Sequence, residues 1–398
     1  MKRLSALLLA VACGGTSTPG QVTNPAGTNL LPVTVDQGPA ALAAANEVSA
    51  NVLYASVTVC TPGSTSACQT IDHIQVDTGS SGLRIVSSVL SGAAVPAPVK
   101  DASGNPLVEC VQFVDSYDWG SVATVDVTLG SRKLSNLRVQ LVGDAAAGSP
   151  PSSCVQGTAL QTVEQFGANG LLGIGNFLQD CGPVCEGRAI PAAYYTCIGA
   201  SCSPVAVPVA SQLQNPAALF SSDNNGVVVQ LPSVASPGAP SMSGNILFGI
   251  NTQSNNALGS AQLLGLTSTG TFTTTLNGGS VPSSFIDSGS NGYFFAGGSI
   301  PNCPDDADFF CPAASVAETA TLTGNSGAAR TVGFTVDNAD TIFQNDNDAV
   351  LPGLAGSNGD FNGTTGFDWG LPFFYVRTVF VLFENQTLNG TVGPALAF

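Results

Sequence analysis

Two short segments of the sequence carry the same set of residues, and that set can do acid–base chemistry. The first is Asp77-Thr78-Gly79-Ser80, directly after an apolar valine, and the second is Asp287-Ser288-Gly289-Ser290, directly after an apolar isoleucine. An aspartate followed by serine or threonine and then glycine occurs nowhere else in the chain. The two aspartates are 287 − 77 = 210 residues apart, which is about the length of one domain. This repetition predicts that the two segments act together.

A pair of carboxyl groups supplies both partners that hydrolysis by an activated water needs. Two like charges about 3 Å apart cannot both ionise, so the pair holds one proton and its two apparent pKa values split. The ionised member takes a proton from the water, and the protonated member donates one to the carbonyl oxygen under attack. Asp77 and Asp287 are therefore the predicted catalytic residues, for hydrolysis of a peptide bond.

The neighbours of each aspartate fit such a pair. Glycine allows a tight turn and a close approach of the two loops without a clashing Cβ atom. The hydroxyl group next to each aspartate can reach the opposite loop, and the following serine can orient the outer carboxylate oxygen. A single copy would be no more than a turn signature, and the second copy favours a site. The predicted supporting residues are Thr78, Gly79, Ser80, Ser288, Gly289 and Ser290.

The composition argues against several other classes of function. The 398 residues include 10 Lys or Arg and 26 Asp or Glu, which gives a formal net charge of −16. A surface of that sign repels phosphate backbones and anionic lipid, so we expect no nucleic-acid partner and no polybasic membrane attachment. The single histidine disfavours a mixed Cys/His metal site. We expect no cofactor beyond the catalytic water, and no metal.

The first 13 residues have the layout of a secretory signal peptide. Lys2 and Arg3 precede the apolar run 4–12, which ends in small residues before Cys13. Residues 10–15 resemble a bacterial lipoprotein cleavage box, in which the cysteine becomes lipidated, although alanine stands where leucine is commoner. We predict lipidation at Cys13, with simple secretion or a coincidental cysteine as the alternatives. Residues 14–28, rich in Gly, Thr, Pro, Ser and Asn, are predicted to be a flexible linker.

Cysteine occurs 11 times, and ten remain when Cys13 is set aside. An even number in an exported chain predicts disulfides. The pairs Cys60/Cys68 and Cys303/Cys311 each bracket a short turn-rich loop and are the predicted local disulfides. The sequence leaves the pairing of six cysteines open: Cys110, Cys154, Cys181, Cys185, Cys197 and Cys202.

Short runs rich in Val, Ile, Thr and Phe, separated by Gly, Pro, Asn and Ser, predict a mainly antiparallel β protein. Such runs occupy residues 52–59, 123–129, 227–231, 245–250, 271–276 and 375–383. Helix is expected only around residues 159–165 and 209–213. The repeated aspartate segment predicts two lobes, an N-terminal β lobe of residues 29–225 and a C-terminal β lobe of residues 226–398.

At these residues the sequence resembles the pepsin-like aspartic peptidases, over most of residues 50–398. Four landmarks resemble, in order, the first hairpin with its active loop, the hydrophobic-hydrophobic-Gly element behind the first aspartate, the strand that opens the second lobe, and the closing helix and strand. They lie at residues 54–81, 168–175, 245–249 and 370–383. The resemblance implies an all-β, bilobal fold with a few short helices and a cleft between the lobes. The chain also resembles an uncharacterised family of exported bacterial proteins.

The pepsin-like family covers its aspartates with a flap hairpin that carries a tyrosine. The matching segment here is residues 113–120. Counting back from Gly120 without a gap puts Phe113 at the position of that tyrosine, whereas residue type favours Tyr117. We predict Tyr117 or Trp119 as the lid residue, and the alternative is that these aromatic side chains are hairpin core.

Other departures from the family pattern bear on activity. Asn169 stands where the family often has aspartate, and Asp368-Trp369-Gly370 replaces the second hydrophobic-hydrophobic-Gly element. Residues 14–28 contain no basic propeptide that could mask the aspartates. Either activation does not need removal of a prosegment, or the protein is not a working protease.

Two further sets of residues were weighed as sites. A Ser–His–Asp triad would have to use His73, which stands four residues before Asp77 in a strand, so a surface or strand-pairing role is favoured. The aspartates within residues 305–308 and 346–348 could bind calcium, but neither stretch fits a twelve-residue calcium loop. We expect both stretches to be solvated turns.

The sequence therefore predicts a secreted or lipid-anchored aspartic endopeptidase of the periplasm or cell surface. We expect a monomer whose partner is an extended polypeptide substrate. The alternative is a binding or structural protein of the cell envelope that has the pepsin fold without turnover. A glycosidase with two carboxylates is a third possibility, and it would need the two groups about 5 Å or more apart.

Overall fold

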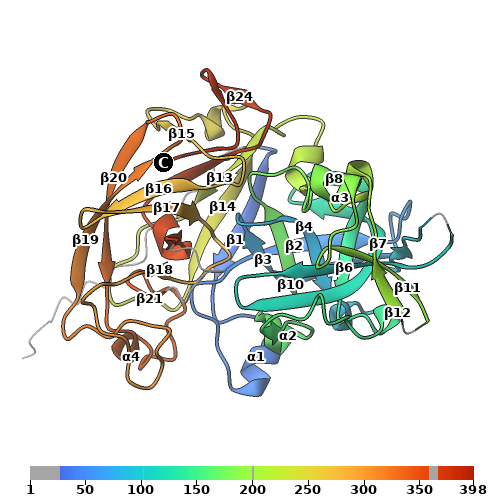
Figure 1. Cartoon of the computed structure of the whole chain (residues 1–398), viewed down its shortest axis with the longest axis horizontal. Coiled ribbons are helices and arrows are strands. Elements are labelled where there is room, and N and C mark those ends of the chain that lie inside the picture. Colours follow the sequence, from blue (N-terminus) through green and yellow to red (C-terminus); the bar gives the residue numbers. More distant parts are fainter. Residues whose placement is uncertain (1–26, 102, 200, 358–365) are drawn as a thin grey trace, which may run out of the picture.

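The computed structural model describes residues 27–101, 103–199, 201–357 and 366–398. Figure 1 shows strands along most of the described chain and helices only as short connections. The α-helices are α1 (Ala40–Ala45), α2 (Val163–Phe166), α3 (Pro183–Gly187) and α4 (Ala339–Ile342). The 3₁₀ turns are η1 (Ser87–Val89), η2 (Ala145–Ala147), η3 (Val209–Ser211), η4 (Pro216–Leu219), η5 (Ser254–Asn256) and η6 (Leu371–Phe374). The all-β class with a few short helices is confirmed.

The predicted signal peptide, Cys13 and most of the predicted linker lie outside the described residues, which begin at residue 27. Among the described residues, no helix combines the length and the apolar character that crossing a membrane would require.

The first half of the chain is built mainly of antiparallel strand pairs. Its longer strands are β2 (Leu53–Cys60), β3 (Cys68–Asp77), β4 (Ser81–Val86), β6 (Leu107–Gln112), β7 (Ser116–Leu129), β8 (Arg132–Val142) and β10 (Gly170–Ile174). Its shorter strands are β5 (Ala97–Pro98), β9 (Thr158–Ala159), β11 (Tyr194–Ile198) and β12 (Ser201–Pro204). β2 pairs with β3 and β7, and β7 pairs with β6 and β8. β4 is buried along its whole length because neighbours cover both of its faces.

The second half of the chain forms a separate seven-stranded sheet in the order β20-β19-β16-β17-β22-β18-β21. Its strands are β16 (Phe272–Leu276), β17 (Gly279–Ile286), β18 (Tyr293–Phe295), β19 (Val316–Thr323), β20 (Ala329–Val336), β21 (Ala355–Ser357) and β22 (Asp368–Trp369). In β20, exposed and buried residues alternate from residue 331 onward, since one face meets the core and the other meets solvent. A small hairpin of β24 (Thr387–Leu388) and β25 (Thr391–Val392) lies apart from it.

A run of strands between the two halves belongs to both. β1 (Leu30–Val35) pairs with β2 on one side and with β14 (Met242–Phe248) on the other. β13 (Gly226–Gln230) then links β14 to β23 (Thr378–Leu382), and β26 (Ala395–Ala397) links β23 to β15 (Leu263–Gly265). Figure 1 shows β1, in blue, between the two halves. The sheet is therefore continuous from the first half into the second.

The strands around the two aspartates are arranged in the same way. β10 runs parallel to β3, with Gly173 opposite Asp77, and antiparallel to β4. β22 likewise runs parallel to β17 and antiparallel to β18. The backbone N–H of Asp287 donates to the carbonyl of Trp369, 3.1 Å away. Each half thus passes one strand directly behind its aspartate loop, and in the second half Asp368-Trp369-Gly370 takes this place.

Five disulfides join the ten cysteines of the described chain. The two predicted local pairs, Cys60–Cys68 and Cys303–Cys311, are confirmed. The pairs that the sequence left open are Cys110–Cys154, Cys181–Cys185 and Cys197–Cys202. Disulfides in this number suggest an oxidising environment of the extracellular type.

Candidate active site

Asp77 is the last residue of β3, and its side chain is held by its own loop. The backbone N–H of Gly79 donates to Asp77 Oδ1 at 2.6 Å, and the Ser80 hydroxyl donates to Oδ2. Asp77 is buried, with 5% of its surface exposed. Two donors on a buried carboxylate stabilise its charged form, because they replace the water that the group has lost.

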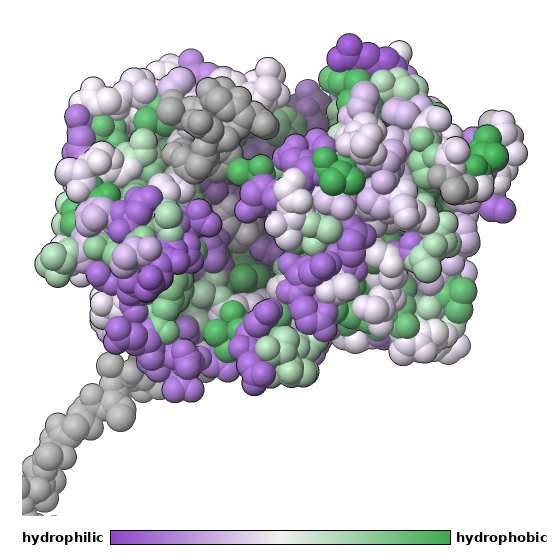
Figure 2. Space-filling view, turned by 60° about the horizontal axis from the view of Figure 1, so that its bottom comes forward, coloured by the Kyte–Doolittle hydropathy of each residue, from purple (hydrophilic) through white to green (hydrophobic). Residues whose placement is uncertain are grey.

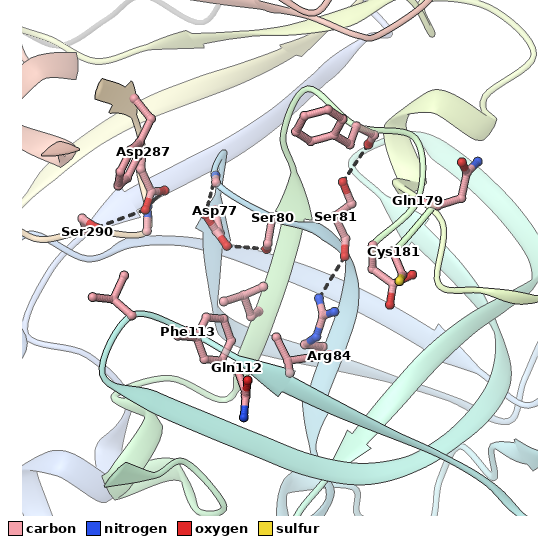
Figure 3. Close-up of a pocket in the computed structure, with 18 of the residues that line it drawn as sticks. Asp77, Ser80, Ser81, Arg84, Gln112, Phe113, Gln179, Cys181, Asp287 and Ser290 are labelled. Atoms are coloured by element: carbon pink, nitrogen blue, oxygen red, sulfur yellow. Dashed lines mark hydrogen bonds between the residues drawn. The ribbon is translucent and has the colours of Figure 1, made fainter. Parts of the chain in front are cut away.

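Asp287 follows β17 and is held in the same way. The backbone N–H of Gly289 donates to Asp287 Oδ1 at 2.7 Å, and the Ser290 hydroxyl donates to Oδ2 at 3.0 Å. Figure 3 shows the Asp77–Ser80 and Asp287–Ser290 pairs on opposite sides of the site. The serines therefore make the carboxylate contacts that the sequence predicted for them.

Hydrogen bonds cross between the two loops and lock them together. The backbone N–H of Thr78 donates to the Ser288 hydroxyl oxygen at 3.1 Å, and the backbone N–H of Ser288 donates to the Thr78 hydroxyl oxygen at 3.0 Å. The Ser288 hydroxyl donates in turn to the carbonyl of Val76 at 2.8 Å. These groups are buried. The arrangement is reciprocal, so neither loop can shift without breaking bonds to the other.

The glycines explain how closely the loops can approach. A Cβ atom on Gly79 would lie 2.8 Å from Cγ of Asp287, and a Cβ atom on Gly289 would lie 2.8 Å from Oδ1 of Asp77. Real side chains do not tolerate such contacts, so any larger residue would push the carboxyl groups apart. The two carboxyl groups lie close enough for the charge of Asp77 to raise the pKa of Asp287, so the pair is more stable with a proton than with two negative charges.

Electrostatics place that proton on the side of Asp287. Burial raises the pKa of Asp287 well above its usual range, and the nearby charges of Asp77 and Asp368 raise it further. Asp287 is therefore the member of the pair whose acid form the site favours.

Asp368 is a third carboxyl group in the site, behind the loop of Asp287. It lies on β22 and is 2% exposed, and the Ser290 hydroxyl acts on its pKa against the effect of burial. Burial raises the pKa of Asp368 to about 8, with a smaller contribution from the charge of Asp77. In the first half of the chain the matching position on β10 is the apolar Leu171. The two halves therefore differ at this position, and burial keeps Asp368 mostly protonated at neutral pH.

The two aspartates face a cleft of about 850 Å³ that both halves of the chain line. Val111, Phe113 and Leu171 line it from the first half, and Phe285 and Glu384 line it from the second. Figure 2 shows the surface hollowed between the two halves of this face. An open cleft of this size, with the acid–base pair on its wall, can admit an extended chain but could not enclose it fully.

The hairpin of β6 and β7 borders this cleft, and residues 107–120 of it are called the lid hairpin below. Its tip lines the cleft with Phe113, Val114 and Asp115. Figure 3 shows Phe113 on the side of the site that faces Asp77. The Phe113 ring packs edge-on against Phe166, with ring centroids 6.5 Å apart.

The prediction of Tyr117 or Trp119 as the lid residue does not fit this geometry. Both rings pack on the far face of the hairpin, in a buried cluster with the Cys110–Cys154 disulfide and Tyr195. The Trp119 indole N–H donates to the carbonyl of Gly148 at 3.0 Å. Side chains alternate between the faces of a strand, so residues 117 and 119 must share a face, and here that face is turned away from the cleft. Tyr117 and Trp119 are therefore part of the hairpin core, which was the alternative to a lid role.

The other residues weighed from the sequence lie away from the aspartate pair. His73 pairs with Asp36 at 3.2 Å, and this contact raises the pKa of its imidazole. The aspartates at 305, 306 and 346 are exposed, as expected for solvated turns. Among the described residues, one group could geometrically hold a metal, Cys303, Cys311 and Asp340. Its two cysteines are joined in a disulfide and cannot act as thiolate ligands.

Two residues of the site were not predicted from the sequence, although each is a charged residue that interrupts an apolar run. Asp368 breaks an apolar pattern, and it was noted only as a departure from the family. Arg84 is a lone cation inside the apolar run 83–86 of a chain with few basic residues. A charged residue inside a run that reads as a buried strand needs a partner, and the sequence does not reveal which one.

The architecture and the paired loops together define a fold of the pepsin-like aspartic proteinase type. One solved structure that matches is an aspartic proteinase from Irpex lacteus, with a TM-score of 0.50 and 17% sequence identity over 92% of this chain and 96% of that one. At this identity the likeness shows the fold alone.

The chain belongs to the family described as protein of unknown function DUF3443, which matches residues 25–398. No curated protein matches the sequence.

Proposed function

We propose that the protein is an aspartic-type endopeptidase that hydrolyses polypeptides with a water activated by Asp77 and Asp287. One observation carries the proposal. Two distant loops of matching sequence are locked together by reciprocal hydrogen bonds, with the glycine of each loop against the carboxyl group of the other, on the wall of an open cleft. Burying two carboxyl groups against each other is costly for stability, so such a pair points to a function.

The chemistry follows from the unequal pKa values of the pair. Asp77, as the carboxylate, accepts a proton from the water whose oxygen attacks the carbonyl carbon. Asp287, as the acid, donates its proton to the carbonyl oxygen. When the tetrahedral intermediate collapses, the C–N bond breaks and the leaving amine takes the proton that Asp77 had accepted. One hydroxyl group of the intermediate returns a proton to Asp287 as the new carboxyl product forms. No cofactor takes part in this scheme.

The close contact favours a peptidase over a glycosidase. A glycosidase with two catalytic carboxylates needs them about 5 Å or more apart, so that a sugar ring or a water fits between them. Here a Cβ atom on the glycine of either loop would meet the carboxyl group of the opposite loop at 2.8 Å to 3.0 Å, and this close approach favours the shorter separation. The cleft also accommodates an extended chain, so the proposed partner is an unfolded or extended polypeptide, bound by a monomer.

Export belongs to the same proposal. The five disulfides fit a protein that works in an oxidising environment. Together with the signal-like residues 1–13, they support secretion to the periplasm or cell surface. Anchoring through a lipid on Cys13 is proposed from the sequence around that cysteine.

The decisive experiment is cleavage of denatured casein by the purified protein between pH 3 and pH 7, with and without pepstatin. We expect cleavage that pepstatin abolishes, and a loss of at least about 1,000-fold in the Asp77→Asn variant, since the base is removed while the shape is kept. The matched control is Asp305→Asn, which makes the same chemical change on an exposed loop and should cleave like the wild type.

Two outcomes would contradict the proposal. Intact casein at every pH, with no thermal shift on adding pepstatin, would favour a binding or structural protein of the cell envelope. Cleavage that survives in the Asp77→Asn variant would show that the activity comes from elsewhere.

A further inference from the structure

A second buried group of charged residues lies beside the cleft, and it joins the lid hairpin to the catalytic loop. Its centre is Arg84 on β4, which is 1% exposed although its side chain borders the cleft. The guanidinium Nη1 donates to the carbonyl of Ser81 at 2.9 Å. Ser81 directly follows the Asp77-Thr78-Gly79-Ser80 segment, so this bond ties Arg84 to the end of the catalytic loop.

The other side of the guanidinium faces the lid hairpin. Its Nη2 donates to Glu109 Oε1 at 2.7 Å, and its Nε lies 3.9 Å from Asp118 Oδ2. Glu109 is on β6 and Asp118 is on β7, so the single guanidinium contacts both strands of the hairpin. Gln140 fixes Asp118 from behind, with an N–H donated to Asp118 Oδ1 at 2.7 Å. Figure 3 shows Arg84 between Ser81 and the hairpin strand that carries Gln112.

The group holds three carboxyl groups, Glu109, Asp118 and Asp180, and one cation, so its charges balance only if two of the carboxyl groups are protonated. Asp180 lies near enough to Glu109 for their charges to interact, and it accepts a hydrogen bond from the Tyr194 hydroxyl at 2.7 Å. Burial and the charge of Glu109 raise the pKa of Asp180 well above its usual range. Burial raises the pKa of Asp118 to about 7, against the opposing effect of Arg84. Arg84 is therefore the cation that makes burial of the hairpin carboxylates tolerable.

The second half of the chain has no such cation at the matching position. Arg84 and Phe294 each stand seven residues after the aspartate of their loop (84 − 77 and 294 − 287). Phe294 instead packs against Phe309, with ring centroids 6.1 Å apart. The charged residue thus occurs only in the half whose hairpin tip lines the cleft, which argues for a role toward that hairpin rather than for a general role in the fold.

We propose that Arg84 is the positioning residue that fixes the lid hairpin on the catalytic loop, so that its Phe113 tip is held over the aspartate pair. As a role in catalysis, this inference rests on the proposed peptidase function. Arg84 binds the base of the hairpin, at Glu109 and Asp118, and leaves the tip at 113–115 free to adjust to a substrate. Preorganised contacts of this kind act mainly on substrate binding, because they spare the substrate the cost of ordering the lid.

The experiment compares Arg84→Met, which keeps the length of the side chain but not its charge, with Arg84→Lys and with Arg132→Met. Arg132 forms an ion pair with Asp223, and neither residue lines the cleft, so it is the matched control for loss of a partly buried pair. Hydrogen exchange of residues 107–120 and steady-state kinetics on one extended peptide are measured for each.

For Arg84→Met we expect exchange at least about tenfold faster in the lid hairpin, with residues outside it unchanged. We expect KM to rise about tenfold while kcat changes by less than about threefold, because the lid contributes to binding more than to the chemical step. Arg84→Lys should restore part of the loss, and Arg132→Met should have wild-type lid exchange and KM.

Unchanged lid exchange in Arg84→Met, or faster exchange spread over the whole chain, would overturn the inference. So would a fall in kcat at constant KM that lysine does not restore. If Arg84→Met fails to fold, Glu109→Gln provides the same test, since it removes the charge that Arg84 binds and should speed exchange in the lid hairpin alone. If the wild type cleaves no peptide, the peptidase function fails, and lid exchange still decides whether Arg84 holds the hairpin.

Discussion

Single residues distinguish two loops that are otherwise near copies. Both aspartates accept hydrogen bonds from a glycine N–H and a serine hydroxyl. Asp368 stands behind Asp287 where the first half has Leu171. Its charge adds to the effects of burial and of Asp77 that raise the pKa of Asp287, so a residue outside both motifs adds to the difference between the loops.

Asp368 should also make stability depend on pH. Burial raises its pKa from 3.8 to about 8, so the folded state binds this proton more tightly than the unfolded state does. Its contribution is fully present below pH 3.8 and is lost as the pH rises toward about 8. We therefore expect Asp368→Asn to gain stability relative to the wild type as the pH rises, by roughly 4 kcal/mol between pH 4 and pH 7.

Urea unfolding of both proteins at pH 4, 5, 6 and 7 measures this difference. The exposed variant Asp305→Asn is the control, and its difference from the wild type should stay small throughout. A gap between Asp368→Asn and the wild type that does not change with pH would show that Asp368 ionises normally in the folded protein.

At the scale of one element, the lid hairpin separates two kinds of aromatic residue. Its cleft side holds Phe113 at the tip, and its far side holds Tyr117 and Trp119 against the Cys110–Cys154 disulfide. The strand period of two residues decides which side chains can meet a substrate. Size and aromatic character alone do not decide it.

Substitutions on the two faces should therefore have different effects. We expect Phe113→Ala to raise KM about tenfold with little change in stability, because it removes a half-exposed ring from the cleft. We expect Tyr117→Leu to lower the free energy of unfolding by about 1–3 kcal/mol and to leave KM near that of the wild type. Kinetics on one extended peptide and urea unfolding test both. A larger effect on KM from Tyr117→Leu than from Phe113→Ala would restore Tyr117 as the lid residue.

At the scale of the whole molecule, the two halves are built as one unit. β1 joins β2 to β14, so the backbone hydrogen bonds of the sheet continue across the predicted lobe boundary. Asn51 adds a buried link: its side-chain N–H groups donate to the carbonyls of Asn291 and Leu351 at 2.8 Å each, and its oxygen accepts from Tyr375 at 2.7 Å. The relative placement of the two aspartate loops depends on these contacts.

This continuity predicts a single cooperative unfolding transition for the wild type. Asn51→Ala should lower stability by about 2–4 kcal/mol, because it leaves buried partners unpaired and its φ of 54° disfavours alanine. Asn51→Gly relieves the backbone strain and loses the same hydrogen bonds, so the difference between the two variants isolates the strain. Calorimetry measures both the number of unfolding transitions and the stability of each variant. Two separate transitions in the wild type would show that the halves fold independently.

The β class, the pair of carboxyl groups and two disulfides could be predicted from short-range sequence patterns. Short runs rich in Val, Ile, Thr and Phe between turn residues indicated the β class, since strand and turn preferences are local. The repeated aspartate loops indicated a pair of carboxyl groups, because the same residue types recur in the same order. The disulfides at 60–68 and 303–311 were predicted because short loops bring their ends together at little entropic cost.

The tertiary structure decided what depends on partners far apart in the chain. The face of the lid hairpin that meets the cleft, the pairing of Cys110 with Cys154 and the placement of β1 are such features. So are the two buried charges that set the character of the site, Asp368 behind Asp287 and Arg84 between the catalytic loop and the lid. A sequence records that a charge interrupts an apolar run, but the energy of that charge depends on which groups surround it, and only the folded chain brings those groups together.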